Sequence, residues 1–318
     1  MNKNILFRFY TPWLFIFLFA AVQINAEINS NAGTSAFPFL KIEPSARAVA
    51  MGGAFTGLAD DESALYYNPA GIAQFETKRY IATYHNYFAD MQSGFLGFVK
   101  PLTPEKTFLG IYLTYLNYGD FTETDNSGNE LGTFSGSDLV VAGTFAYKHT
   151  YNWRFGLTGK LIYEKVHDYS ATGLAFDIGA KYSSDREYYT AGLMVQNLGF
   201  QMTALGDEKE SLPLSIRAGG SARLKGLPLL LTSDIILPTD NDMALAIGGE
   251  YAVAKPFFIR AGWNTFGSNY QAANSDDNWA GLGLGFGFDV KDKMQISYAF
   301  TPAAELGDSH RITLSGGF

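Results

Sequence analysis

The residue types that carry most catalysis and metal binding are not arranged for either task in this chain. The four histidines, His85, His149, His167 and His310, lie far apart and have no paired spacing that would bind a metal ion. There is no Gly-x-Ser-x-Gly elbow, no His-Glu-x-x-His helix and no cysteine. We therefore predict a protein that is not an enzyme, with no catalytic, cofactor-binding or metal-binding residues.

One run of carboxylates, Asp60 to Glu62, raises the question of a cation site. The run lacks the regular spacing of oxygen ligands and the glycine of a calcium loop. Acidic residues stabilise helix N-termini and pair with arginine, so we interpret the run as a helix cap or as a partner for Arg47. Two further acidic pairs are interpreted as solvated turn residues: Asp240 with Asp242, and Asp276 with Asp277.

The composition predicts a membrane protein that does not bind nucleic acid. Charged residues make up only 17% of the 318 residues, whereas a soluble domain usually devotes about a quarter to them. Aromatic residues reach 15%, as expected where aromatic girdles mark the two membrane interfaces. The net charge of −8, without a cluster of lysine and arginine, is unsuited to contacting phosphates.

From residue 79 onward the chain alternates between apolar and polar residues, which is the pattern of β-strands with two different faces. The clearest segment is Asn152 to Glu164, where Trp153, Phe155 and Leu157 share one face. The sequence predicts about fourteen strands and an all-β fold, a transmembrane antiparallel up-and-down β-barrel. The predicted strands are 79–88, 93–101, 106–118, 138–148, 153–167, 172–183, 188–197, 212–225, 227–237, 242–252, 256–264, 278–290, 293–301 and 309–318.

The lengths of the connections separate a membrane barrel from a soluble sandwich, which also alternates. The longest predicted gaps are 119–137, 198–211 and 265–277, and each follows an odd-numbered strand. The gaps after even-numbered strands are short, as at 149–152 and 291–292. Bacterial barrels have short periplasmic turns and longer extracellular loops, so this asymmetry predicts a membrane barrel with both termini on the periplasmic side.

The N-terminal residues resemble a cleaved signal peptide and predict an outer-membrane location. Lys3 and Arg8 provide the positive start, Trp13–Val22 is apolar, and Ala26 is a small residue before Glu27. The next fifty residues are rich in Ala and Gly and do not alternate, so we expect them to plug the barrel lumen. The predicted domains are a signal peptide (1–26), an N-terminal plug segment (27–78) and an outer-membrane β-barrel (79–318).

The polar face of the predicted strands carries charges that would point into the lumen. Such charges could bind the plug or guide a solute, or they could satisfy one another in pairs, because an isolated charge in a low-dielectric setting is costly. A one-residue register slip would reverse the faces. The glycines of Gly281–Phe288 also share one face, which would leave room for the plug or a ligand, or permit curvature. The predicted lumen charges are Arg154, Lys160, Glu164, Asp177, Lys181, Arg217, Arg223, Asp234, Glu250, Arg260, Asp289 and Arg311.

Two blocks of the N-terminal region, FLKIEPSARAVAMGGA from Phe39 and ALYYNPAG from Ala64, resemble the PorV/PorQ family of outer-membrane proteins, which is similar to the FadL-type transporters. The resemblance covers about fifty residues and implies a fourteen-stranded barrel with its N-terminal segment in the lumen. It also implies one of two roles. The first is non-enzymatic binding or handing on of exported proteins, as in type IX secretion or surface attachment. The second is a FadL-like channel for long-chain fatty acids or other hydrophobic small molecules. The plug motif comprises Arg47, Met51, Gly52, Gly53, Asp60, Asp61, Tyr67, Asn68, Pro69, Ala70 and Gly71.

The expected partners follow from these two predictions. Outer-membrane lipid would surround the barrel. The chain ends with Ile312, Leu314, Gly316 and Phe318 on one face, which resembles the C-terminal signal read by the barrel-assembly machinery. The PorV/PorQ resemblance adds secretion-system components and exported cargo proteins as possible partners.

Overall fold

The computed structural model describes residues 31–88, 91–103, 106–270, 279–290, 293–302 and 307–317. The predicted signal peptide, Asp276, Asp277 and Phe318 therefore lie outside the described residues. Within the described ranges, no helix is long and apolar enough to cross a membrane.

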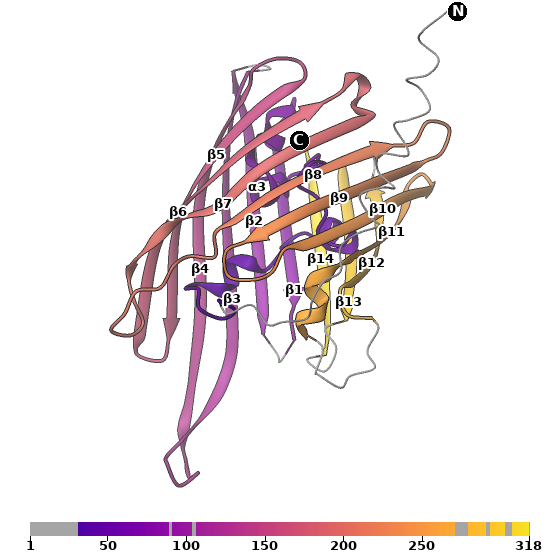
Figure 1. Cartoon of the computed structure of the whole chain (residues 1–318). Helices are drawn as coiled ribbons and strands as arrows, with labels where there is room; N and C mark the ends of the chain where they lie inside the picture. The colour runs from indigo at the N-terminus through magenta and orange to yellow at the C-terminus, as the bar shows by residue number, and fades with distance from the viewer. Residues whose placement is uncertain are drawn as a thin grey trace, which may run out of the picture. The chain divides into compact units, whose positions relative to one another are not determined.

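Fourteen antiparallel strands form a closed barrel (Figure 1). Each strand pairs with its neighbours in sequence, and β1 pairs with β14 to close the ring, with Arg79 opposite Gly317. The predicted fold is thereby confirmed. The strands are β1 (Arg79–Asn86), β2 (Gln92–Thr103), β3 (Thr107–Thr124), β4 (Glu130–Lys148), β5 (Trp153–Val166), β6 (Tyr169–Ser183), β7 (Tyr189–Thr203), β8 (Ser215–Arg223), β9 (Leu229–Pro238), β10 (Ala244–Ala254), β11 (Phe257–Asn264), β12 (Leu282–Val290), β13 (Met294–Pro302) and β14 (Asp308–Gly317).

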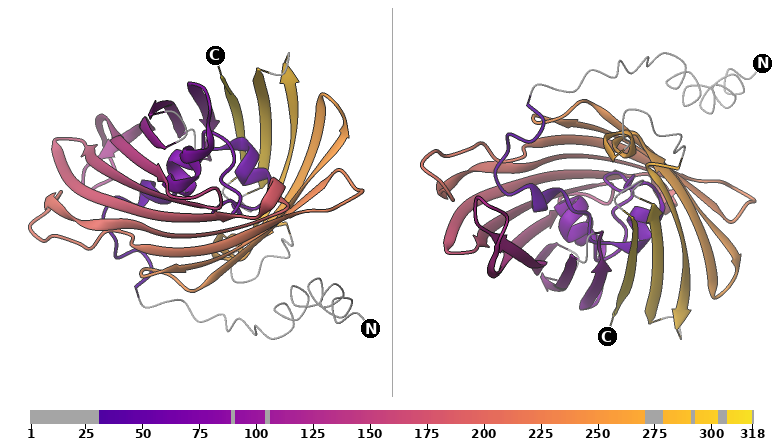
Figure 2. Two further views of the ribbon diagram at one scale, coloured as in Figure 1. Left: turned by 90° about the horizontal axis from the view of Figure 1, so that it is seen from above. Right: turned by 90° about the horizontal axis from the view of Figure 1, so that it is seen from below.

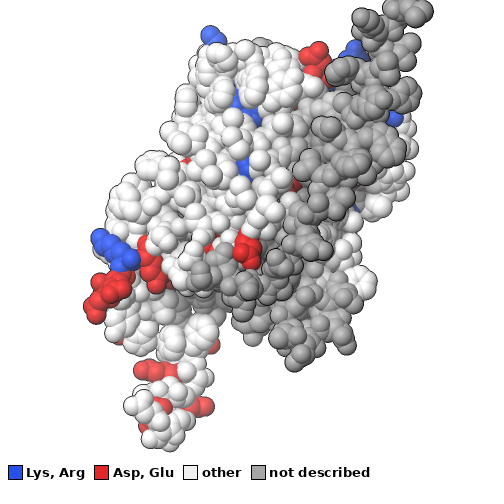
Figure 3. All heavy atoms as spheres, viewed as in Figure 1, with Lys and Arg blue, Asp and Glu red and all other residues white. Residues whose placement is uncertain are grey.

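The burial pattern of the strands is the reverse of that in a soluble β-sandwich. On β5, Trp153, Leu157 and Leu161 are 45%, 48% and 60% exposed, whereas Arg154 and Lys160 on the opposite face are buried. A soluble sheet buries its apolar face, but a membrane barrel presents that face to lipid. In Figure 3 charged side chains are sparse over the strands in view. This face therefore suits a hydrocarbon environment.

The first of the three predicted long loops is wrong, because 119–137 is mostly a hairpin. Strands β3 and β4 continue past the rim of the barrel as a two-stranded ribbon that projects at the bottom of Figure 1. Phe121 lies opposite Phe134 across this ribbon, and their rings stack with centroids 5.4 Å apart. Gly, Ser and Asn in the ribbon suggested a loop, but cross-strand pairs such as this one stabilise strands.

The segment before the barrel forms short helices, which Figure 2 shows within the ring of strands. Ser45 caps α2 by accepting a hydrogen bond from the Ala48 amide, and Asn68 caps η3 by accepting one from the Ala70 amide. Whether the segment acts as a plug is a question of function. The helices are η2 (Pro38–Lys41), α2 (Ala46–Ala50), α3 (Ala64–Tyr67) and η3 (Pro69–Gln74) in this segment, and η4 (Asp185–Glu187) and η5 (Thr265–Tyr270) between strands.

Glycines on the inner face of the strands let this segment approach the barrel wall closely. A Cβ atom added to Gly262 of β11 would lie 2.1 Å from the carbonyl carbon of Met51, and one added to Gly283 of β12 would lie 2.2 Å from the Val49 carbonyl oxygen. Both distances are too short for any side chain. The predicted glycine stripe of β12 therefore makes room for α2.

Candidate functional site

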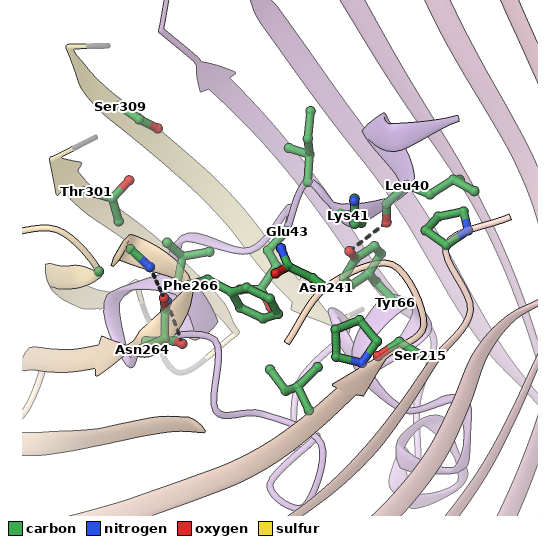
Figure 4. Close-up of a pocket in the computed structure, with 18 of the residues that line it drawn as sticks. Leu40, Lys41, Glu43, Tyr66, Ser215, Asn241, Asn264, Phe266, Thr301 and Ser309 are labelled. Atoms are coloured by element: carbon green, nitrogen blue, oxygen red, sulfur yellow. Dashed lines mark hydrogen bonds between the residues drawn. The ribbon is translucent and has the colours of Figure 1, made fainter. Parts of the chain in front are cut away.

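A cavity of about 380 Å³ lies where the N-terminal segment meets the strand ends that carry the predicted extracellular loops. Figure 4 shows its lining residues, which come from both parts of the chain. Leu40 and Tyr66 belong to the N-terminal segment, and Ile236 and Phe266 come from β9 and η5. The volume falls within the range of about 300–1,000 Å³ that is usual for small-molecule sites.

Three ion pairs border the cavity and hold charged side chains of its lining in place. Arg217 lies 3.2 Å from a Glu43 carboxylate oxygen and 3.8 Å from Asp234, and Lys41 lies 2.7 Å from Asp240. Arg311, the third cation of the lining, donates to the Glu43 carbonyl, Thr301 and Ser309. The charged side chains of the cavity are thus held by protein groups, which leaves its apolar residues as the main attraction for a ligand.

Asp240 corrects the prediction of a solvated turn residue. It is only 4% exposed and accepts hydrogen bonds from Ser35 and Lys41. These partners lie about two hundred residues away in the sequence, so local turn chemistry could not reveal them. Together they join the start of the described chain to the β9–β10 connection.

A buried network of ion pairs also holds the N-terminal segment against the barrel. Arg47 of α2 lies 2.9 Å from Asp61 and 2.8 Å from Glu250 of β10, and it also bonds Asp60. Arg260 of β11 pairs with the same Glu250 at 2.7 Å. The network therefore links the plug motif to the barrel wall on the side of the predicted periplasmic turns.

The opposite charges in this network stabilise the ionised forms of Arg47 and Asp60. Burial alone would lower the pKa of Arg47, but the carboxylates of Asp60, Glu250 and Asp61 raise it well above its ordinary value. Burial would raise the pKa of Asp60, yet Arg47 and Arg223 hold it below the ordinary value. Arg47 and Asp60 are therefore both charged at neutral pH.

The remaining predicted lumen charges lie on the inner face and most are bonded to other groups. Lys160 pairs with Asp177 at 2.7 Å, and Lys181 donates to the carbonyl of Ala59 at 2.9 Å. Arg154 donates to Ser183. In the part of the chain that the structure describes, no group of three or more His, Asp or Glu side chains could hold a metal ion. Arg154, Lys160, Glu164, Asp177, Lys181, Arg217, Asp234, Glu250, Arg260 and Arg311 are buried, whereas Arg223 and Asp289 are partly exposed.

The rest of the plug motif ends helix α2, links the segment to the barrel through Asn68 and is otherwise buried. The Asn68 side chain donates to the carbonyls of Thr56 and Ala180, which ties α3 to β6. Gly52 and Gly53 follow α2 with φ of 70° and 79°, the left-handed conformation that commonly ends a helix. Four further motif residues are fully buried: Met51, Tyr67, Pro69 and Ala70. Gly71 is buried as well, and a Cβ there would clash with the Ala59 carbonyl.

Glu62 gives a testable pH dependence. Its side chain is 1% exposed, and burial together with the nearby Asp61 raises its pKa to about 7, although Arg79 pairs with it. A carboxyl whose folded-state pKa exceeds its unfolded value stabilises the fold below the unfolded pKa, and that stabilisation is lost as pH rises through the folded pKa. We expect the unfolding temperature to fall by a few degrees between pH 5 and pH 9.

The control for this prediction is Glu62→Gln, which keeps the shape and removes the titration. Heat unfolding of the detergent-solubilised barrel, followed by gel mobility without boiling, measures the effect. A wild-type profile that is as steep as that of the variant across this pH range would contradict the assignment to Glu62.

The predicted site residues leave out several polar residues of the cavity, among them Gln196, Ser215 and Glu43. The first two are neutral, so a search for inward-facing charges passed over them. Glu43 lies inside the quoted N-terminal block, but nothing in its local sequence indicates that it reaches Arg217. Alternation along β7 and β8 does place Gln196 and Ser215 on the inner face, and that was the available signal.

The comparisons with known proteins identify the fold. A model of an uncharacterised protein family (UPF0164) matches residues 18–164, which is less than half of the chain. No curated protein matches the sequence. The toluene transporter TodX of Pseudomonas putida has a TM-score of 0.60 at 13% identity, over 87% of this chain and 99% of that chain. The closed barrel of this chain therefore has a fold similar to that of TodX.

Two further solved structures support the same assignment. The monoaromatic hydrocarbon channel CymD has a TM-score of 0.57 at 13% identity, over 89% of this chain and 99% of that chain. A FadL homologue of Pseudomonas aeruginosa has a TM-score of 0.53 at 14% identity, over 91% and 98%. The FadL-like part of the predicted resemblance is therefore confirmed for the fold, and the PorV/PorQ part stays a prediction.

Proposed function

We propose that this protein is an outer-membrane channel for small apolar molecules, with the 380 Å³ cavity as its first binding site. The cavity carries the proposal, because it lies at the predicted extracellular end and exposes mainly apolar surface, while its charged side chains are bonded to other protein groups. A cavity of about 150 Å³ can hold benzene, so this one has room for a substituted benzene. Two of the structurally similar proteins, a toluene transporter and a monoaromatic hydrocarbon channel, support this size class.

The N-terminal segment would act as the predicted plug in this channel. It forms the floor of the cavity through Leu40 and Tyr66, and its other side carries the Arg47 network. A solute that leaves the cavity toward the periplasm would have to pass this segment. We therefore propose that passage requires the segment to shift locally.

The secretion role implied by the PorV/PorQ resemblance remains the alternative. The solved relatives named above are channels, and no contact in the described structure favours a cargo protein. The barrel-assembly machinery and the surrounding outer-membrane lipid remain expected partners of the channel as well, since any outer-membrane barrel requires both.

Uptake of radiolabelled toluene by intact cells tests the channel. Ile236 lines the cavity and is 5% exposed, whereas its neighbour Ile235 faces outward and is 38% exposed. We expect Ile236→Trp to fill the cavity and abolish most of the barrel-dependent uptake, because the added indole occupies the space of the solute. The matched variant Ile235→Trp places the same side chain in lipid and should transport normally.

Equal surface expression of the three proteins is checked by the mobility of unboiled samples. Cells that express the wild-type barrel but take up toluene no faster than cells with an empty vector would contradict the channel. Equal uptake by the two tryptophan variants would show that this cavity is not on the path.

A further inference from the structure

Three polar side chains on one wall of the cavity have nitrogen or oxygen atoms that lack a hydrogen-bond partner among the described residues. They are Gln196 Nε2, Ser215 Oγ and Arg217 Nε. These residues are only 4%, 9% and 4% exposed. Gln196 lies directly opposite Ser215 in the β7–β8 ladder, and Arg217 follows two residues later on the same face. Three potential donors therefore stand side by side.

The surrounding protein provides few hydrogen-bond acceptors for these side chains. Arg217 uses its terminal nitrogens for Glu43 and for the Gly53 carbonyl, which leaves Nε. The Tyr66 hydroxyl donates to the Leu40 carbonyl. The Gln196 amide is within hydrogen-bond reach of the Tyr66 hydroxyl, which leaves Ser215 and Arg217 as the two side chains that need an acceptor. Buried donors are nearly always paired, and a ligand is the natural source of the missing acceptor.

The charge around Arg217 selects the kind of acceptor. Glu43 and Asp234 already lie 3.2 Å and 3.8 Å from its guanidinium. A ligand carboxylate beside Arg217 would bring a third negative charge to that guanidinium, and like charges in a poorly solvated site repel strongly. Arg311 also lines the cavity, and its described hydrogen bonds go to the Glu43 carbonyl, Thr301 and Ser309. A neutral oxygen accepts the same hydrogen bonds without that repulsion.

We propose that the preferred solute is an apolar molecule of about the size of a substituted benzene that carries one neutral oxygen acceptor, which Ser215 and Arg217 bind. This inference rests on the proposed channel function and narrows it, because a pure hydrocarbon would leave the donor row unpaired. Ser215 and Tyr66 both line the cavity (Figure 4), so that the polar end of the solute would lie against β8 and its apolar body against Tyr66 and Ile236.

Acetophenone and α-methylstyrene form the test pair, since they differ only by a carbonyl oxygen in place of a methylene group. Binding to the full barrel in lipid nanodiscs is measured by equilibrium dialysis, with empty nanodiscs subtracted. We expect acetophenone to bind about tenfold more tightly, the effect of about one well-formed hydrogen bond. Ser215→Ala should reduce this preference to about threefold or less and leave the affinity for α-methylstyrene unchanged.

Thr232→Ala is the matched control, because the Thr232 hydroxyl is equally buried and also lacks a described partner but does not line the cavity. It should leave both affinities unchanged. Equal affinity of the wild type for the two probes, or an equal loss of both in Ser215→Ala, would overturn the inference while leaving the channel intact. Benzoate binding more tightly than acetophenone would overturn the neutral acceptor. If neither neutral probe binds, the proposed function itself fails.

Discussion

Replacing Arg47 with methionine is expected to lower the free energy of unfolding by about 3–5 kcal/mol, because the change removes one partner from a buried ion network. Arg47 contacts three carboxylates, and its side chain is only 10% exposed. Without it, Asp60 retains only its ion pair with Arg223, Asp61 loses its ion pair with Arg47, and Glu250 retains only Arg260. Methionine keeps an unbranched, largely apolar stem but is shorter than arginine, so the expected loss also includes the packing of the guanidinium over Phe55.

The matched control is Arg223→Met, which removes a second arginine from the same Asp60. Arg223 is 42% exposed, and exposed pairs contribute at most about 1 kcal/mol. Urea unfolding in lipid vesicles, followed by tryptophan fluorescence, compares the two. If the two variants lose the same free energy of unfolding, burial does not increase the contribution of Arg47 to stability.

The network has a consequence for transport. Arg47 lies in α2 and Glu250 in β10, so their contact fixes the N-terminal segment against the wall on the side away from the cavity. A variant with a weakened network should therefore release solute more readily if the segment must shift for passage. In the uptake assay, Arg47→Met would transport faster than the wild type wherever it still folds.

Most of the barrel could be predicted from the sequence because alternation is a local property. The residues of β5 alternate so regularly that the sequence alone indicates which face meets lipid. The extension of β3 and β4 could not be read in this way, since 119–137 is rich in Gly, Ser and Asn. There the partner strand decides, through pairs such as Phe121 with Phe134.

The candidate site was less predictable because it depends on contacts between distant parts of the chain. Arg47 with the acidic run was foreseeable from charge, and this pairing is present in the structure. The link between Asp240 and Ser35 was not, because nothing near Asp240 indicates burial. Ser215 and Gln196 can be recognised as candidate binding residues only in the folded chain, where they lie opposite each other in the wall of the cavity.

Lys160→Met should lower the free energy of unfolding by about 3–5 kcal/mol, as much as Arg47→Met. In this case both partners of the broken ion pair belong to strands of the barrel. Lys160 of β5 and Asp177 of β6 are 2.7 Å apart and are 2% and 0% exposed. Asp177 also accepts a hydrogen bond from the Asn197 amide, and Lys160 donates to the Asn197 side chain. Removing the lysine leaves a carboxylate with a single backbone donor.

The double variant Lys160→Met with Asp177→Leu separates the charge from the hydrogen bonds. It removes both charges together, which is often neutral in a buried pair, but it leaves the two Asn197 groups without partners at about 1–3 kcal/mol each. We therefore expect the double variant to be less destabilised than the sum of the two single variants, and still below the wild type. Lys165→Met, an exposed position on the same strand, controls for the loss of a lysine. If the losses of unfolding free energy in the two single variants add up to the loss in the double variant, Lys160 and Asp177 contribute to stability independently.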